Sequence, residues 1–278
     1  MARQPVAVTA QEALSLAPAG FFAEPPDGHF WLEHLVRVLA ARGGAAEEEA
    51  DRAWQFLALA GDGEENLALY AVNTHTRYAM FHATEPRRGG ALLAEALSRF
   101  PPEKVLANYG ALDAAVRAAG LEGRIVRDHR ELFLILPCGE LGVEPDWRYR
   151  LAGLEDIPRL EAYNRLYNAE RATNWRRDWH RAVQARSVYV GECDGVIASC
   201  LIKGALLPPL ISCGGVFTFP EFRGRGEATR LVANFCAEMA LSGLDVCLLV
   251  DDDNLPALRV YGRVGFRPAA LYRTTYFA

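Results

Sequence analysis

The chain has 278 residues, of which 51% are hydrophobic and 23% charged, and a net charge of −5. This length predicts two domains, and the ordinary globular composition excludes disordered and fibrous classes. The longest apolar runs are far shorter than the roughly 20 residues of a membrane span. The acidic balance argues against a polyanion as the main partner, because nucleic-acid binders usually carry a basic excess.

The start of the chain and its cysteines indicate a cytoplasmic protein. Residues 1–5 do not open a signal peptide, because no apolar stretch follows a basic start. The six cysteines follow no metal-ligand spacing, and several lie inside apolar runs, as Cys247 does. We therefore expect reduced, buried thiols and no metal site.

The first half of the chain alternates helical and extended patterns. Helices are predicted at Phe30–Leu39 and around Glu47–Glu49, and a loop at Thr84–Gly90 precedes a helix at Ala91–Phe100. Another helix, Ala111–Ala119, ends at Gly120. Strands are predicted at Trp54–Leu59, Leu67–Val72, Arg77–His82, Lys104–Asn108 and Glu131–Leu136.

The segment Cys138–Asp146 contains the glycine and proline residues typical of a linker. We therefore divide the chain into a domain of residues 1–140 and a domain of residues 146–278. The second domain is slightly basic and the remainder carries the acidic excess, so the two halves differ in character.

The second half again alternates helices and strands. A helix opens at Leu154–Pro158 and keeps its spacing to Tyr167, and a polar stretch follows to Arg177. Asp194-Gly195 predicts the turn of a hairpin formed by Ser187–Cys193 and Val196–Ile202. The remaining predicted elements are a glycine-interrupted strand Leu210–Thr218, a loop to Gly226, an amphipathic helix Glu227–Leu241 before Gly243, a buried strand Asp245–Val250, a helix capped by Asn254 and closed by Gly265, and strands over Phe266–Phe277.

The loop Arg223–Ala228 follows a strand and opens a helix, which is the arrangement of an anion site. Its two glycines let successive amide groups point outward, the helix N-terminus adds its positive end, and Arg223 and Arg225 add charge. The simpler interpretation is a basic surface turn. The loop matches neither Walker A nor the dinucleotide fingerprint, so a nucleotide-binding function lacks the lysine and the magnesium ligand that such sites use.

The order of these elements resembles the GNAT superfamily of N-acetyltransferases. The motifs are the strand Gly215–Thr218, then Pro220, the loop from Arg223 to Ala228, the strand ending at Asn254, and Tyr261 before Val264–Phe266. The resemblance covers residues 146–278 and implies acetyl-CoA, or a related acyl-CoA, as donor, without a metal. It implies that the CoA pyrophosphate binds Arg223, Gly224, Arg225, Gly226, Glu227 and Ala228. It also implies that backbone groups of Val216, Phe217 and Thr218 pair with the pantetheine arm, and that the thioester enters between that strand and the next.

The resemblance also implies roles in the chemistry. An amide N–H of Val216 or Phe217 would stabilise the tetrahedral oxyanion. Tyr261 would protonate the departing CoA thiolate, and its alternative role is that of a packing aromatic. Asn254 lies two helical turns before Tyr261 on the same face, where it caps the helix and would also touch CoA.

The general base is the point at which the sequence departs from the common pattern. Many relatives place a carboxylate on the strand that here reads Ile211–Val216, and this strand has none. Glu221 lies just after the strand and is the candidate carboxylate, although a solvated loop position is the simpler interpretation. Glu170 and His180 lie in the polar segment expected to line the acceptor site. A water chain, or an amine that arrives neutral, would need no named base.

Residues 53–137 repeat the element order of the second half and are interpreted as a degenerate copy of it. Aligning Gly90 with Gly226 places Arg87 on Arg223, and aligning Gly120 with Gly265 places Val116 on Tyr261 and Tyr109 on Asn254. The proposed acid is therefore absent from the first half, which is expected not to be catalytic. The alternative is an unrelated α/β domain.

The sequence thus predicts an α/β (α+β) protein with two GNAT-like domains, each a mixed, mostly antiparallel sheet flanked by helices. The predicted function is transfer of an acetyl group from acetyl-CoA to an amine; the alternative is a non-catalytic acyl-CoA-binding or regulatory module. The partner is expected to be a small-molecule or peptide amine, with no nucleic acid and no membrane. Small amines, amino acids, antibiotics, peptide N-termini and protein lysines all remain open as acceptors, as do the length of the acyl donor and the oligomeric state.

Overall fold

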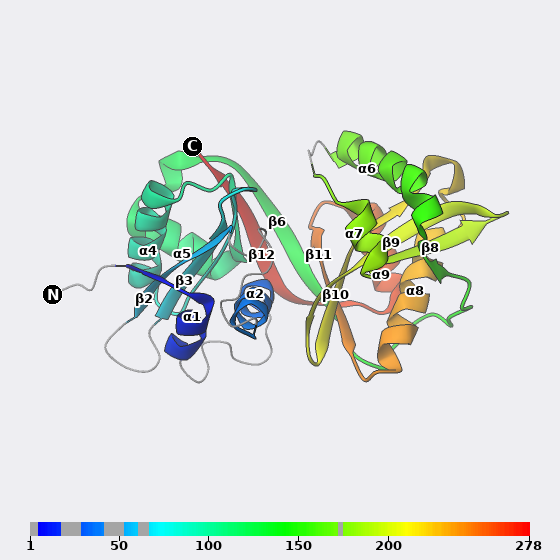
Figure 1. Cartoon of the computed structure of the whole chain (residues 1–278), viewed down its shortest axis with the longest axis horizontal. Coiled ribbons are helices and arrows are strands. Elements are labelled where there is room, and N and C mark those ends of the chain that lie inside the picture. Colours follow the sequence, from blue (N-terminus) through cyan, green and yellow to red (C-terminus); the bar gives the residue numbers. More distant parts are fainter. Residues whose placement is uncertain (1–4, 18–28, 42–52, 61–66, 172–174) are drawn as a thin grey trace. The chain divides into compact units, whose positions relative to one another are not determined.

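A computed structural model describes residues 5–17, 29–41, 53–60, 67–171 and 175–278. The predicted helix around Glu47–Glu49 lies outside these residues. The chain divides into two compact units (Figure 1): unit 1 comprises residues 1–133 with 269–278, and unit 2 comprises residues 134–268. Both units are α/β, which confirms the predicted fold class.

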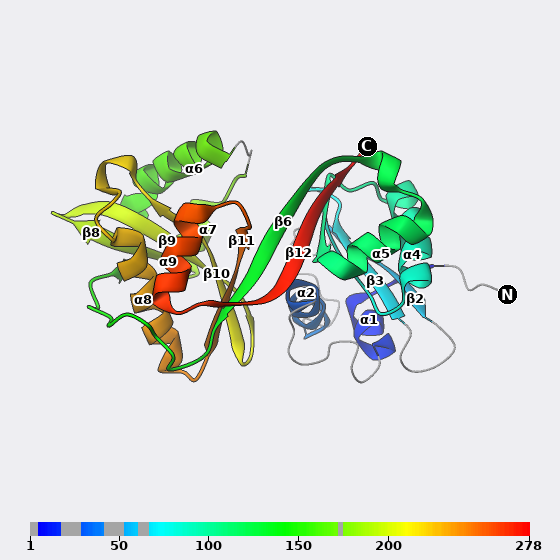
Figure 2. The same cartoon turned by 180° about the vertical axis from the view of Figure 1, so that it is seen from behind.

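Unit 1 is a mixed sheet with helices on both faces (Figure 2). Its strand order is β1-β2-β3-β4-β5-β12-β6, in which β4 and β5 run parallel. The strands are β1 (Val6–Val8), β2 (Trp54–Ala60), β3 (Leu67–Asn73), β4 (Tyr78–Ala83), β5 (Lys104–Asn108), β6 (Ile125–Leu136) and β12 (Arg267–Phe277). The helices are α1 (Ala10–Leu16), α2 (Phe30–Ala41), α4 (Pro86–Arg99), α5 (Tyr109–Ala119) and the 3-10 turn η1 (Glu122–Arg124).

Alternating side chains of β3 explain why both faces are covered. Tyr70 and Val72 pack in the core that includes α4 and α5, whereas Leu69 and Ala71 pack in the core that includes α1 and α2. Successive strand residues point to opposite faces, so a strand that is apolar and buried from Leu67 to Val72 must be covered on both sides.

Helix α4 begins at Pro86, so the predicted loop over Thr84–Gly90 is wrong. Proline is favoured in the first turn of a helix, and the Glu85 carboxylate caps α4 by accepting from the amides of Arg87 and Arg88 at 3.0 and 2.9 Å. Gly90 lies inside the helix, where an added Cβ would be 3.0 Å from the carbonyl oxygen of Ala115 in α5. The glycine therefore permits close helix packing and forms no loop.

Helix α5 shows which residue corresponds to Asn254. Its N-cap is Asn108, whose side chain accepts from the amides of Gly110 and Ala111, and its C-terminal Gly120 has a φ of 64°. Asn254 caps its own helix in the same way. The alignment of Tyr109 with Asn254 is therefore off by one residue, because α5 is one residue longer than its counterpart.

The last strand of the chain belongs to unit 1 for most of its length. β12 pairs antiparallel with β5, from Tyr272 opposite Asn108 to Tyr276 opposite Lys104. Arg273 is buried and donates to both oxygens of Asp128 in β6 at 2.8 and 2.9 Å. Residues 269–278, which were assigned from the sequence to the second domain, thus belong to the sheet of unit 1. The other boundary between the two units lies within β6, between Phe133 and Leu134, and not in the predicted linker.

Unit 2 carries the motifs of the second half. Its strand order is β11-β10-β9-β8-β7. The strands are β7 (Arg150–Leu151), β8 (Val188–Cys193), β9 (Val196–Leu207), β10 (Leu210–Thr218) and β11 (Asp245–Asp251). The helices are η2 (Leu154–Asp156), α6 (Ile157–Arg171), α7 (Trp179–Gln184), η3 (Pro220–Phe222), α8 (Glu227–Ala240) and α9 (Leu255–Val264).

The β8–β9 hairpin and helix α8 form as predicted. Asp194 and Gly195 have φ values of 53° and 75°, which is the backbone of a type I′ turn. In β8, Val188 and Val190 face α6 and α7, and Tyr189 faces α8, where its ring lies 5.0 Å from that of Phe235. Helix α7 was missed because it has only six residues and directly follows the polar stretch that ends at Arg177.

The cysteines follow the expectation of burial only in part. Four are buried, Cys193 is half-buried and Cys138 is exposed, and all six are free thiols. Cys138 follows β6 at the start of the predicted linker, where no apolar run encloses it.

Candidate active site

The loop between β10 and α8 presents unpaired backbone amides at the start of a helix. Gly224 and Gly226 have φ values of 76° and 84°, in the left-handed region that favours glycine. Gly226 is the N-cap of α8 and, as a glycine, has no side chain with which to cap the helix. The first N–H groups of a helix lack intrahelical partners, and the helix dipole favours an anion there. The geometry therefore fits a phosphate group.

The two arginines of the loop differ in their surroundings. Arg223 donates to both carboxylate oxygens of Glu170 at 2.7 and 2.9 Å and to the carbonyl oxygen of Thr218 at 3.0 Å. The guanidinium of Arg225 is exposed and lies 5.7 Å from the ring centre of Phe222. The Glu170 carboxylate is thus bound to the Arg223 guanidinium, the group that an anionic ligand would contact.

Glu227 and Ala228 form the first turn of α8. The Glu227 side chain is buried beside Arg230, with a distance of 3.4 Å between its Oε1 and the arginine Nη1. This side chain is directed inward, so only its backbone is placed with the loop amides.

Strands β10 and β11 separate after a short parallel pairing. Within the described part of unit 2, they pair at three positions, from Leu210 opposite Asp245 to Ser212 opposite Cys247. β10 continues to Thr218 and β11 to Asp251. The loss of pairing beyond Ser212 and Cys247 agrees with the predicted opening between these two strands.

A bulge interrupts β10 next to this opening. The register with β9 shifts between Gly214 and Phe217, so Gly215 and Val216 have no register partner on β9. Gly215 has a φ of 57°, and its carbonyl oxygen accepts a hydrogen bond of 3.1 Å from the hydroxyl of Tyr163. A bulge redirects the peptide groups of a strand, which frees backbone groups beside the opening.

Tyr261 lies inside the unit with its phenol protonated at neutral pH. Its side chain is buried, and burial, followed by the nearby Cys213, Tyr167 and Cys236, raises the pKa of Tyr261 well above its usual range. Its ring packs edge-on against Phe266 at 5.7 Å. A phenol that keeps its proton can act as a hydrogen-bond donor or an acid.

Asn254 is placed as predicted at the start of α9. Its side chain accepts from the amide of Ala257 at 3.4 Å. The capping role is therefore present in the structure, two helical turns before Tyr261.

Glu221 is poorly suited to act as a general base. It lies in η3, half exposed, and its carboxylate receives a hydrogen bond of 2.7 Å from Arg159. This hydrogen bond lowers the pKa of Glu221, and a carboxylate with a lowered pKa accepts protons less readily. His180 is exposed in α7, and Glu170 is engaged by Arg223.

The structure adds an aromatic cluster that sequence reasoning missed. The ring of Tyr163 lies 5.2 to 6.1 Å from four other rings, those of Tyr167, Trp175, Trp179 and Phe217. Trp175 inside the polar stretch and Trp179 just after it were the available signal. An ion pair between Arg171 at the end of α6 and Asp251 at the end of β11 was also missed.

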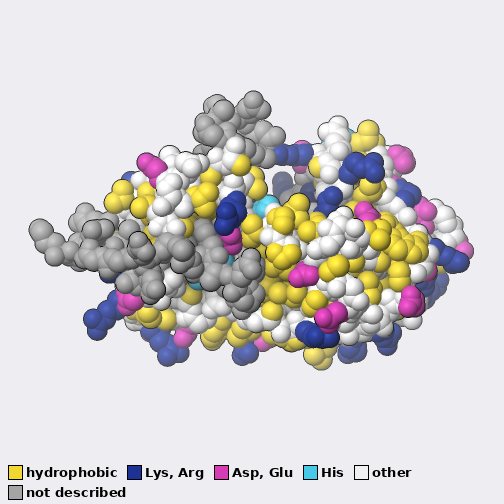
Figure 3. Space-filling model, turned by 90° about the horizontal axis from the view of Figure 1, so that it is seen from below, with side chains coloured by type: hydrophobic (Ala, Val, Ile, Leu, Met, Phe, Trp, Pro, Cys, Tyr) yellow, Lys and Arg dark blue, Asp and Glu magenta, His cyan; other side chains and the backbone are white. Residues whose placement is uncertain are grey.

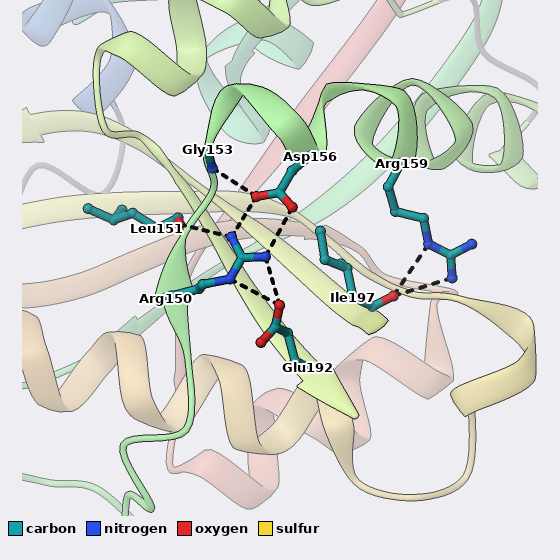
Figure 4. Close-up of polar contacts among 7 residues, drawn as sticks. All are labelled: Arg150, Leu151, Gly153, Asp156, Arg159, Glu192 and Ile197. Carbon is teal, nitrogen blue, oxygen red and sulfur yellow. Dashed lines mark hydrogen bonds and ion pairs between the residues drawn. The ribbon is translucent and has the colours of Figure 1, made fainter. Parts of the chain in front are cut away.

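A polar network fixes the start of α6 (Figure 4). This helix also carries Tyr163 and Glu170. Arg150 in β7 donates to Asp156 at 2.5 and 3.0 Å and to Glu192 in β8 at 2.7 Å, while the Gly153 amide donates to Asp156 at 2.8 Å. One turn on, Arg159 donates to the carbonyl oxygen of Ile197 in β9 at 3.3 Å. These contacts tie α6 to the sheet.

Charges and possible metal ligands are dispersed. On the face shown in Figure 3, basic and acidic side chains are interspersed. Among the described residues, no three His, Cys, Asp or Glu side chains gather as metal ligands would. No helix in the described ranges is both long and apolar enough to cross a membrane.

Comparison with known proteins agrees with this geometry. Residues 189–278 match the family model of FR47-like proteins. An acetyltransferase of the GNAT family from Colwellia psychrerythraea is 13% identical, with a TM-score of 0.60 over 99% of this chain and 100% of that one. A GCN5-related N-acetyltransferase from Sphaerobacter thermophilus is 16% identical, with a TM-score of 0.60 over 98% and 94% of the two chains.

A tandem GNAT protein from the clavulanic acid biosynthesis pathway is 15% identical, with a TM-score of 0.55 over 98% of both chains. No curated protein matches the sequence. The structural likeness extends over both halves of the chain, so the chain shares the fold of these GNAT acetyltransferases.

Proposed function

We propose that this protein of the GNAT fold is an acyl-CoA-dependent N-acetyltransferase, which moves an acetyl group from acetyl-CoA to an amine. The observation that carries the proposal is the juxtaposition, within unit 2, of an uncapped α8 N-terminus, the separated strands β10 and β11, and the bulge at Gly215–Val216. An anion site, an opening for a thioester and redirected backbone groups are the three features that the reaction needs.

In the proposed binding mode, the loop amides and the guanidinium groups of Arg223 and Arg225 hold the CoA pyrophosphate. Gly224, Gly226, Glu227 and Ala228 contribute backbone groups, since the Glu227 side chain is buried. The backbone of Val216, Phe217 and Thr218 pairs with the pantetheine arm, as an added strand would. Binding requires the pyrophosphate to displace the Glu170 carboxylate from Arg223.

In the proposed mechanism, the neutral amine nitrogen attacks the thioester carbonyl and a C–N bond forms. The N–H of Val216 or Phe217 donates to the oxyanion of the tetrahedral intermediate. The intermediate collapses with cleavage of the C–S bond, and the Tyr261 hydroxyl gives its proton to the sulfur. The amine proton leaves to water, and a proton from water restores the Tyr261 hydroxyl, so that the protons balance over the cycle. Glu221, which is paired with Arg159, takes part in no step. Asn254 caps α9 and holds its first turn beside the ligand.

Unit 1 is proposed to be a degenerate copy that binds no CoA. The N-terminus of α4 is capped by its own Glu85 carboxylate, in the place that an anionic ligand would take. Val116, which aligns with Tyr261, is a buried aliphatic residue without a proton to donate. An internal anion at the helix start opposes binding of a second one.

The test is a thiol-release screen with acetyl-CoA against small amines, amino acids, aminoglycosides, peptide N-termini and protein lysines. We expect one amine class to release free CoA well above the rate of hydrolysis, with an acetylated product seen by mass spectrometry. Binding of acetyl-CoA without release for any class would favour the non-catalytic acyl-CoA-binding module. Absence of acetyl-CoA binding would refute both.

A further inference from the structure

The hydroxyl of Tyr163 reaches from α6 to the bulge of β10. It donates to the carbonyl oxygen of Gly215 at 3.1 Å. A Cβ added to Gly215 would lie 2.7 Å from this hydroxyl oxygen, and the φ of 57° is itself unfavourable for other residues. Glycine at this position therefore serves the contact with Tyr163 as well as the bulge.

The contact fixes the direction of the next amide group. The carbonyl of Gly215 and the N–H of Val216 belong to one planar trans peptide, so they point in opposite directions. Because the carbonyl points to Tyr163, the N–H of Val216 points away from it. Val216 also has no register partner on β9, so pairing with that strand does not set the orientation of this peptide.

Tyr163 is suited to hold the peptide still. Its side chain is fully buried in the aromatic cluster, where Phe217 and Trp179 lie 5.2 and 5.6 Å away. Burial, with smaller contributions from Cys200 and Tyr167, raises the pKa of Tyr163 well above its usual range. The hydroxyl therefore stays a donor throughout the neutral range.

We infer that Tyr163 is a positioning residue, whose hydrogen bond to Gly215 aims the Val216 N–H at the carbonyl of the bound thioester. This inference rests on the proposed function, and it selects Val216 over Phe217 as the oxyanion donor. A donor preorganised toward the oxyanion is typically worth about 10²–10³-fold in kcat. If the N–H is present but its direction is not fixed, at least about 10-fold of this contribution to kcat should be lost.

The experiment compares Tyr163→Phe with the matched control Tyr167→Phe, which removes a phenol hydroxyl one turn along the same helix. Isotope-edited infrared spectroscopy of acetyl-CoA labelled with ¹³C at the acetyl carbonyl reports polarisation of the bound thioester without an acceptor. We expect the carbonyl stretch to move to lower frequency on binding to the parent and to Tyr167→Phe. In Tyr163→Phe it should stay near its value in solution, while calorimetric affinity for acetyl-CoA stays within about 3-fold.

With an acceptor from the screen, kcat of Tyr163→Phe should fall at least 10-fold with an unchanged KM for acetyl-CoA. Gly215→Ala, which disturbs the same contact from the strand side, should lose the infrared shift as well. An unaltered shift and kcat in Tyr163→Phe would overturn the inference, and so would failure of both variants to fold, since the hydrogen bond would then be structural. If the parent itself binds no acetyl-CoA, the proposed function fails instead.

Discussion

Substitutions at Gly226 can separate the effect of charge on the proposed pyrophosphate site from the effect of side-chain shape. The residue is the N-cap of α8 with a φ of 84°, and a Cβ built there meets no atom within 4 Å. Gly226→Asp and Gly226→Asn therefore add nearly identical side chains into open space. Both incur the left-handed backbone cost of about 1 kcal/mol, which corresponds to a fall in Tm of about 2–4 °C.

The two variants differ in charge alone. A carboxylate about 5 Å from one phosphate charge is opposed by about 3 kcal/mol at an effective dielectric constant of 20, and solvent at this exposed loop reduces that figure. We expect at least about 1.4 kcal/mol to remain, which is a 10-fold weaker affinity for acetyl-CoA in Gly226→Asp than in Gly226→Asn. Calorimetry at low salt measures the difference, and it should shrink as salt is added.

If both folded variants bound acetyl-CoA as tightly as the parent, the reasoning would be refuted, since no anion would then lie at this helix start. A loss of binding in Gly226→Asn as large as in Gly226→Asp would show that the backbone conformation, and not the charge, controls the site.

Four further predictions follow from the same geometry. Tyr261→Phe should lower kcat about 100-fold or more with acetyl-CoA affinity within a few-fold of the parent; near-parental turnover would make Tyr261 a packing residue. Calorimetric titration should give one acetyl-CoA site per chain, and two equal sites would contradict the degenerate-copy interpretation. Glu170→Gln should tighten acetyl-CoA binding up to about 5-fold, because an exposed ion pair with Arg223 worth up to about 1 kcal/mol no longer competes; Glu161→Gln on the same helix is the control, and an equal effect there would exclude competition. Asp156 has a pKa lowered by its hydrogen bond from the Arg150 side chain, so its stabilisation is present above a pH of about 4 and is lost as the pH falls through the folded pKa. Melting of Asp156→Asn should therefore approach that of the parent below pH 4, and a constant gap down to pH 3 would contradict this.

Local sequence patterns determined most of the elements. The Asp194-Gly195 hairpin, helix α8 and the Asn254 and Gly265 caps of α9 form as predicted, because turn chemistry and helix caps act over a few residues. The order of these elements sufficed to indicate the GNAT fold.

Local patterns misled where glycine has two uses. Gly226 lies in a left-handed turn at a helix start, whereas Gly90 lies inside a helix against the Ala115 backbone. Each glycine follows an arginine by three residues. The local sequence therefore does not show whether the glycine is there for a turn or for close packing against another helix. The two helix starts differ in their caps: the Glu85 carboxylate caps α4, whereas α8 begins at Gly226, which has no side chain.

The partners of individual side chains were decided only by the tertiary structure. The pairing of β12 with β5 brings together residues more than 150 positions apart, and the local pattern of β12 does not identify its partner strand. The contact of Tyr163 with Gly215 spans 52 positions. Hydrogen bonds at such separations depend on how the sheet packs against its helices, so sequence alone set the site's loop and strands, and packing set the direction in which its amides point.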